Sequence, residues 1–269
     1  MQKNNNRPIG IFDSGFGGLT VMSAISKCLA NEDLIYFGDT AHVPYGSKSK
    51  DAVIGFSKGI AAFLVKKNVK LIVVACNTAS AFALTRLQKS LKIPIIGVIE
   101  PGAKAAVAAS KNKNIGVIGT EGTIKSDSYF KAIKKISKAK VSQQACPLFV
   151  PLVEEGWIND AITQDTVKRY LKSLLNKNKN IDALVLGCTH YPLLKNVLQK
   201  HAGKKIILID SAKATANEVK TILESKNIKA AKKKAKISFF VSDNPKKFKL
   251  IGKKFFSKKI SSVKKIDLE

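Results

Sequence analysis

The chain has 269 residues, 45% of them hydrophobic, which is enough for two small domains or one large one with buried cores. The longest apolar run, residues 71–76, is far shorter than the roughly 20 residues that cross a bilayer, and no apolar signal-peptide core follows the polar start. We therefore expect a cytoplasmic protein rather than a membrane protein. The net charge of +28 comes almost wholly from lysine, whereas proteins that read nucleic acids favour arginine.

Short apolar runs alternate along the chain with segments of helical periodicity. Strands are expected at residues 9–12, 34–37, 71–75, 95–98, 115–118, 183–186, 206–209 and 237–241. Helices are expected at 17–30, 51–66, 77–90, 101–110, 122–138, 163–176, 192–202, 211–226 and 244–255. This alternation, with continuously apolar strands, predicts an α/β fold of mainly parallel sheets covered by helices on both faces. Ligands bind such sheets at the carboxyl ends of the strands.

Two pairs of segments in the sequence resemble each other. Residues 9–15 (IGIFDSG) resemble residues 115–121 (IGVIGTE), and residues 73–78 (VVACNT) resemble residues 185–190 (VLGCTH). The two offsets, 106 and 112, nearly agree, which predicts two related α/β units with their cysteines in equivalent positions. If the units face each other across a cleft, the two thiols face each other as well.

Two of the four cysteines, Cys76 and Cys188, each end a predicted strand and precede a predicted helix start. A thiol at a helix N-terminus meets positive partial charge and unpaired N–H groups, which favour the reactive thiolate. A single buried cysteine is more often a small hydrophobe, but two at matching strand ends favour function. Cys28, expected within a helix, and Cys146, before a proline, are interpreted as structural. No CxxC pair or cysteine–histidine cluster occurs, so neither disulfides nor a metal site are expected.

The glycine-rich loop at residues 13–18 (DSGFGG) resembles a dinucleotide-binding loop only in part. Thr20 stands where the last glycine of GxGxxG belongs, and Asp13 would repel a phosphate. An acid at this strand end suits a substrate ammonium group or a neighbouring proton, although Asp and Ser also favour helix N-caps. A nucleotide site is therefore not expected here.

Further polar groups stand near predicted strand ends. Glu154 and Glu155 lie on a predicted connection, where surface acids are usually solvated. His190 lies two residues after Cys188; a lone histidine is more often structural, but this one could donate or store a proton. Groups that could bind two carboxylates and an amine, each of which alone could be a helix cap or turn residue, are Ser14, Asn77, Thr78, Thr120, Thr123 and Thr189, with Pro44, Tyr45 and Gly46 in a turn.

Seven segments spanning most of the chain resemble the glutamate racemases of the aspartate/glutamate racemase family. They are DSGFGGLTV at 13–21, YFGDTA at 36–41, PYG at 44–46, ACNTAS at 75–80, GVIEPG at 97–102, PLFVPLVEEG at 147–156 and LGCTHYPLL at 186–194. The segment FFVSD at 239–243 is also similar. Related aspartate racemases usually carry Cys-Thr-Glu at the second cysteine, so His190 after Thr189 favours glutamate.

The resemblance implies two pseudo-symmetric α/β domains, residues 1–99 with 211–269 and residues 100–210, with the active site in the cleft between them. It implies cofactor-independent interconversion of L- and D-glutamate, which supplies D-glutamate for peptidoglycan. Its two acid/base residues would be Cys76 and Cys188. The assisting groups would be Asp13, Glu154 and His190, and the substrate contacts would be the polar groups above. A homodimer is also expected, because the family often dimerises.

Three alternatives stay open. A racemase of the same fold could act on aspartate or another amino acid. A pyridoxal-phosphate enzyme would need a phosphate loop, and no such loop is visible. Residues 226–269 hold 15 lysines against three acids, so this basic C-terminal region could contact nucleic acid, although a lysine-biased surface explains the same charge.

Overall fold

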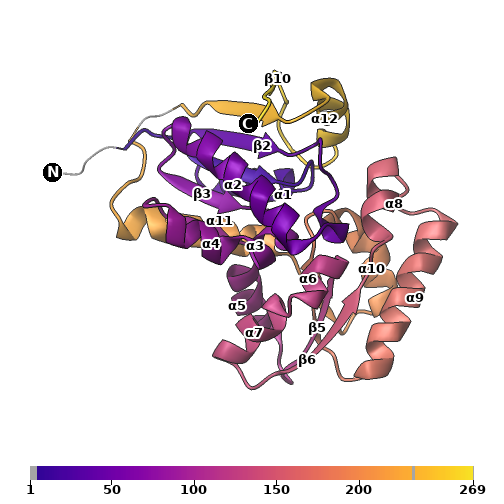
Figure 1. Cartoon of the computed structure of the whole chain (residues 1–269). Helices are drawn as coiled ribbons and strands as arrows, with labels where there is room; N and C mark the ends of the chain where they lie inside the picture. The colour runs from indigo at the N-terminus through magenta and orange to yellow at the C-terminus, as the bar shows by residue number, and fades with distance from the viewer. Residues whose placement is uncertain (1–4, 232–233, 269) are drawn as a thin grey trace. The chain divides into compact units, whose positions relative to one another are not determined.

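The computed structural model describes residues 5–231 and 234–268, and the chain divides into two compact units (Figure 1). Unit 1 comprises residues 1–98 and 212–269, and unit 2 comprises residues 99–211. The chain therefore leaves unit 1 once and returns to it after completing unit 2.

Unit 1 is built on a six-stranded parallel sheet of order β10-β9-β2-β1-β3-β4. Its strands are β1 (Ile9–Asp13), β2 (Leu34–Gly38), β3 (Leu71–Val74), β4 (Ile95–Gly97), β9 (Ile237–Val241) and β10 (Val263–Lys265). Its helices are α1 (Leu19–Cys28), the 3-10 helix η1 (Tyr45–Ser47), α2 (Lys50–Lys66), α3 (Asn77–Phe82), α4 (Leu84–Ser90), α11 (Ser211–Ser225, beginning at the crossing) and α12 (Pro245–Gly252).

Unit 2 is built on a four-stranded parallel sheet of order β6-β5-β7-β8. Its strands are β5 (Asn114–Gly119), β6 (Lys140–Ala145), β7 (Ala183–Gly187) and β8 (Ile207–Ile209). Its helices are α5 (Ile99–Ala109), α6 (Glu121–Lys125), α7 (Ser128–Ile136), α8 (Phe149–Glu155), α9 (Ala161–Lys177), the 3-10 helix η2 (Tyr191–Leu194) and α10 (Lys195–Ala202).

The two sheets share a four-strand arrangement, β2-β1-β3-β4 in unit 1 and β6-β5-β7-β8 in unit 2. The register places Leu71 of β3 beside the first residue of β1, and Ala183 of β7 beside the equivalent Ile115 of β5. Cys76 lies five positions after Leu71, and Cys188 lies five positions after Ala183. Both cysteines therefore hold the same position beyond the carboxyl end of equivalent strands, and the predicted parallel α/β fold is confirmed.

Residues 149–155 form helix α8, although the sequence predicted a connection around Glu154 and Glu155. That prediction was wrong because the helix is short and contains Pro151, which obscures its periodicity. Pro151 lies in the first turn, where the missing N–H removes no helical hydrogen bond. The helix leaves Glu155 exposed and Glu154 partly buried.

A buried ion pair ties distant segments of unit 1 together. Lys70 Nζ lies 2.6 Å from Glu32 Oε2, and both side chains are almost fully buried. Lys70 also donates hydrogen bonds to the carbonyls of Asn5 and Ile228, and Glu32 Oε1 accepts one from the N–H of Ala230 at 2.7 Å. The N-terminal segment, the start of β3 and the segment after α11 thus meet at one point.

We expect Lys70→Met to lower the free energy of unfolding by about 3–5 kcal/mol, because the change leaves Glu32 charged and buried without its ion-pair partner. Urea denaturation measures this loss. Lys125→Met is the matched control, since Lys125 pairs with Glu121 at 3.7 Å on the surface and its loss should cost under about 1 kcal/mol. Equal losses in the two variants would contradict a structural role for the buried pair.

Candidate active site

In unit 1, candidate residues lie together at the carboxyl ends of β1 and β3. Cys76 is the N-cap of α3, and its Sγ accepts a hydrogen bond from the N–H of Ala79 at 3.5 Å. Cys76 Sγ also lies 3.8 Å from the hydroxyl oxygen of Ser14. The sulfur therefore sits where the N–H groups of a helix start attract negative charge.

Asp13 is the last residue of β1 and is fully buried. Its Oδ2 accepts a hydrogen bond from the N–H of Gly15 at 3.0 Å, so it closes this turn and does not cap α1, whose N-cap is Gly18. The hydroxyl of Tyr36 donates to the carbonyl of Gly15 at 3.0 Å. Burial, followed by the negative charges of Asp13 and Cys76, raises the pKa of Tyr36, which therefore stays a neutral donor.

The packing around Gly18 accounts for a glycine in this loop without a bound nucleotide. A Cβ atom at this position would lie 2.5 Å from the Cβ of Asp13 and 2.9 Å from the Cβ of Ala75. Only glycine lets the start of α1 approach the two strand ends this closely. The need for glycine at this position thus comes from the close packing of the start of α1 against Asp13 and Ala75, next to Cys76.

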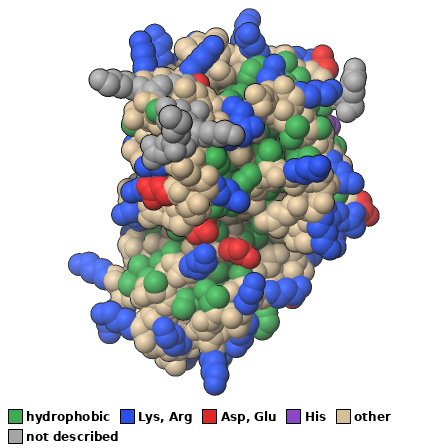
Figure 2. Space-filling model, turned by 90° about the vertical axis from the view of Figure 1, so that its left-hand side faces the viewer, with side chains coloured by type: hydrophobic (Ala, Val, Ile, Leu, Met, Phe, Trp, Pro, Cys, Tyr) green, Lys and Arg blue, Asp and Glu red, His purple; other side chains and the backbone are tan. Residues whose placement is uncertain are grey.

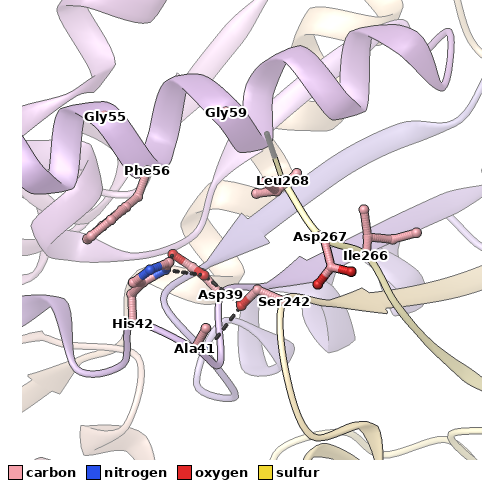
Figure 3. Close-up of a pocket in the computed structure, with 10 residues that line it drawn as sticks. All are labelled: Asp39, Ala41, His42, Gly55, Phe56, Gly59, Ser242, Ile266, Asp267 and Leu268. Atoms are coloured by element: carbon pink, nitrogen blue, oxygen red, sulfur yellow. Dashed lines mark hydrogen bonds and ion pairs between the residues drawn. The ribbon is translucent and has the colours of Figure 1, made fainter.

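Tyr45 of the 44–46 turn is buried and donates its hydroxyl to Asp39 Oδ2 at 2.5 Å. Asp39 also accepts a hydrogen bond from Ser242 Oγ, and its two oxygens lie 2.9 and 3.0 Å from His42 Nδ1 (Figure 3). Burial and then the charge of Asp39 raise the pKa of Tyr45, so the phenol is a neutral donor. Sequence reasoning did not single out Asp39 or Ser242, although both lie in segments that it noted.

In unit 2, Cys188 follows β7 and precedes a helix start, as predicted, but unlike Cys76 it is not the N-cap of that helix. Its carbonyl accepts a hydrogen bond from the N–H of Tyr191 at 3.2 Å, and this turn separates Cys188 from η2, which begins at Tyr191. Pro192 then lies in the first turn of η2, as expected. Cys188 Sγ instead lies 3.9 Å from His190 Nδ1, so an imidazole takes the place of a helix N-terminus.

His190 connects Cys188 to Glu154. Its Nε2 lies 3.0 Å from Glu154 Oε1, and the imidazole is almost fully buried. Burial alone would lower the pKa of His190, but hydrogen bonds to Cys188 and Glu154, with the charges of both, raise it to about 10. His190 is therefore protonated at neutral pH and can hold a proton beside the sulfur.

This raised pKa predicts how stability depends on pH. The ordinary pKa of 6.5 applies to the unfolded chain, so the His190 contribution is fully present below about pH 6.5 and is lost as the pH rises to about 10. We expect the difference in unfolding free energy between the wild type and His190→Asn to shrink across that window. Urea titrations at several pH values measure it, and a difference independent of pH would contradict the assignment.

The remaining candidates are buried hydroxyl and amide groups near strand ends. Thr120 caps α6 by accepting a hydrogen bond from the N–H of Thr123 at 3.3 Å, and the two threonine hydroxyls lie 3.0 Å apart. The others are Ser14, Asn77 and Thr78 in unit 1 and Thr189 in unit 2, while Pro44 is exposed and Gly46 is partly buried.

The other two cysteines have different surroundings. Cys28 is the last residue of α1 and is exposed, rather than lying within a longer helix as predicted. Cys146 is buried, and burial raises the pKa of its thiol. Within the described residues, no group of three or more His, Cys, Asp or Glu side chains could hold a metal ion.

Lysine and arginine side chains are scattered over the whole face shown in Figure 2, with acidic side chains between them, and they do not form a single patch there. This distribution is typical of a surface with a general lysine bias. None of the helices in the described part of the chain is both long and apolar enough to span a membrane.

Comparison with known proteins places this chain and its fold in one class. The Asp/Glu/hydantoin racemase family model matches residues 9–219. The chain is 50% identical to the glutamate racemase of Geobacter metallireducens over 265 residues, covering 98% of this chain and 97% of that protein. The chain therefore belongs to the Asp/Glu/hydantoin racemase family and is an isomerase.

Within that family the similarity is to the glutamate racemases. The structure of glutamate racemase RacE1 from Bacillus anthracis has a TM-score of 0.94 and 42% identity, with 98% of each chain covered. The Francisella tularensis glutamate racemase in complex with D-glutamate has a TM-score of 0.90 and 38% identity, again with 98% of each chain covered. The Picrophilus torridus aspartate racemase shares 18% identity at a TM-score of 0.55, which shows a common fold alone.

Proposed function

We propose that the protein interconverts L- and D-glutamate without a cofactor, with Cys76 and Cys188 as its two acid/base residues. The observation that carries the proposal is their equivalent position beyond β3 and β7, each in a buried polar setting supplied by its own unit. The near full-length similarity to glutamate racemases, one of them in complex with D-glutamate, supports glutamate as the substrate.

The chemistry requires two groups. Racemisation removes the Cα proton and returns a proton from the opposite face, so a single residue would have to swing around the substrate. Under the proposal, one cysteine as thiolate takes the proton while the other, as thiol, donates one. The two sulfurs then exchange protonation states, and the roles reverse for the other enantiomer.

Each sulfur has its own assisting groups. Asp13 lies on the Cys76 side, where a buried carboxylate suits the substrate ammonium group or a proton passing to sulfur. His190, held by Glu154, serves Cys188 as a charged proton store. The proposed substrate contacts are the backbone and side chains of Ser14, Pro44, Tyr45, Gly46, Asn77, Thr78, Thr120, Thr123 and Thr189.

General acid–base catalysis contributes about 10²–10⁴-fold per group, which is too little for so weak a carbon acid. The remaining acceleration must come from stabilising the carbanionic state. N–H groups such as those at the start of α3, and exclusion of water by the buried surroundings, supply that kind of stabilisation.

Chiral chromatography tests the substrate. Purified protein is incubated with L-glutamate and, separately, with L-aspartate, with no cofactor added. The proposal predicts D-glutamate up to an equal mixture and little change in aspartate. Turnover of aspartate alone would replace glutamate with aspartate, and turnover of neither would overturn the proposal.

The proposed product feeds peptidoglycan synthesis in the cytoplasm, a reducing compartment that suits the four free thiols. Expression of the gene should rescue a bacterium that needs external D-glutamate. We also propose a homodimer, which light scattering would report as twice the 29.2 kDa of the chain.

We expect Gly18→Ala to lower kcat/KM about 10²-fold, because the new Cβ displaces Asp13 and the start of α3 from their working geometry. Gly55→Ala is the matched control. A Cβ at Gly55, within α2, meets nothing within 4 Å, so activity should be kept and stability should rise by up to about 1 kcal/mol. Normal kinetics in Gly18→Ala would show that this packing does not matter for catalysis.

A further inference from the structure

Ser242 lies immediately after β9, in the segment that returns to unit 1 and outside residues 9–219 that the family model matches. β9 pairs with β2 so that Val241 lies beside Gly38, which brings Ser242 to Asp39. Ser242 Oγ donates a hydrogen bond to Asp39 Oδ1 at 2.7 Å and accepts one from the N–H of Ala41 at 2.9 Å (Figure 3). Both hydrogen-bonding functions of this hydroxyl are thus directed at the loop that follows β2.

The next residue, Asp243, forms hydrogen bonds with the same loop. The N–H of Asp243 donates to the hydroxyl oxygen of Thr40 at 3.0 Å, and the Thr40 hydroxyl donates to the carbonyl of Asp243. This reciprocal pair holds the end of β9 against the start of the loop. The loop between β2 and η1 therefore takes part of its shape from residues about 200 positions away in the sequence.

Asp39 transmits this contact to Tyr45. Its carboxylate is almost fully buried, with Ser242 Oγ on Oδ1 and the hydroxyl of Tyr45 on Oδ2. The imidazole of His42, stacked on Phe56 at a ring-centroid distance of 4.0 Å, flanks both oxygens. Each oxygen has its own hydroxyl donor, so the plane of the carboxylate, and with it the direction of Tyr45, is defined from both sides.

We propose that Ser242 is a positioning residue that acts through Asp39 on the turn at Tyr45. The inference rests on the proposed function, in which this turn contacts the substrate. Without the Ser242 hydroxyl, Asp39 loses a donor and the N–H of Ala41 loses its acceptor, so the carboxylate and the turn lose their fixed orientation. A contact of this kind binds substrate and transition state alike, so KM changes more than kcat.

Steady-state kinetics of Ser242→Ala with L- and D-glutamate test the proposal. We expect KM to rise about tenfold with kcat within about threefold, the scale of one lost hydrogen bond to a charged group. Ser242→Thr should restore KM because it keeps the hydroxyl, and the pocket of about 360 Å³ beside Ser242 leaves space for a methyl group. Adding Ser242→Ala to Tyr45→Phe should not raise KM further, since both act through the same contact.

Glu32→Gln is the control for a purely structural effect. It disturbs the ion pair with Lys70 in the same unit, so it should lower the melting temperature without changing KM. If Ser242→Ala fails to fold, Asp39→Asn, which keeps the side-chain shape, gives the same test. Suppose that the wild type is active. An unchanged KM in Ser242→Ala, or a rise in KM that adds to that of Tyr45→Phe in the double variant, then overturns this inference alone. A wild type that racemises nothing overturns the proposed function itself.

Discussion

Replacing Cys76 or Cys188 with alanine is expected to lower the rate of glutamate racemisation by about 10²–10⁴-fold or more, because each change removes one of the two groups that transfer the proton. Chiral chromatography measures turnover, and far-UV circular dichroism verifies that each variant is folded. Cys28→Ser is the matched control, since this exposed thiol at the end of α1 lies outside the proposed machinery and activity should be unchanged.

The two alanine variants should also differ from each other. Each variant keeps one of the two thiols and can therefore exchange a proton on only one face of the substrate. Any residual exchange of the Cα proton in D₂O should be confined to one enantiomer of glutamate, and to the opposite enantiomer in the other variant. Near-normal turnover in either variant would contradict the two-base mechanism.

His190→Asn is expected to lower kcat/KM about 10²-fold, because Cys188 loses the charged imidazole that lies 3.9 Å from its sulfur. The loss should be equal for L- and D-glutamate, since enantiomers have equal free energy and the equilibrium constant is one. Glu154→Gln should cost less, about tenfold, because it leaves the imidazole beside Cys188 and removes the charge that supports it.

Racemisation assays in both directions measure these losses. Lys177→Gln is a suitable control, because this exposed lysine of α9 contacts residues 143 and 144 and no candidate residue. Wild-type kcat/KM in His190→Asn would remove the histidine from the mechanism. A larger loss in Glu154→Gln than in His190→Asn would reverse the order of roles proposed here.

The central strands could be predicted because burial imposes a simple pattern on them. Every residue of β1, β3 and β7 is buried, and apart from Asp13 at the end of β1 each strand is a continuous run without polar side chains. β6, at the edge of its sheet, contains the polar sequence KVSQQA and is mostly only partly buried, and β10 has three residues. These two strands have no continuous apolar pattern in the sequence, so they can be recognised only from their pairing with a neighbouring strand.

The site was predictable to the extent that it depends on strand ends. Cys76, placed by β3 and the start of α3, lies where the sequence indicated. The surroundings of Cys188 were not predictable, because a turn closed by its carbonyl lies between the strand and the helix and places His190 beside the sulfur. Asp39 and Ser242 meet because β9 pairs with β2 across about 200 residues, and no local pattern encodes that register.

Proton NMR of the purified, reduced protein with L-glutamate in D₂O, with no cofactor added, tests the central claim most directly. The account predicts that the Cα–H signal disappears while D-glutamate accumulates to an equal mixture, because the proton returned to Cα comes from a thiol in exchange with solvent. A folded protein that leaves the Cα–H signals of both L- and D-glutamate intact would contradict it.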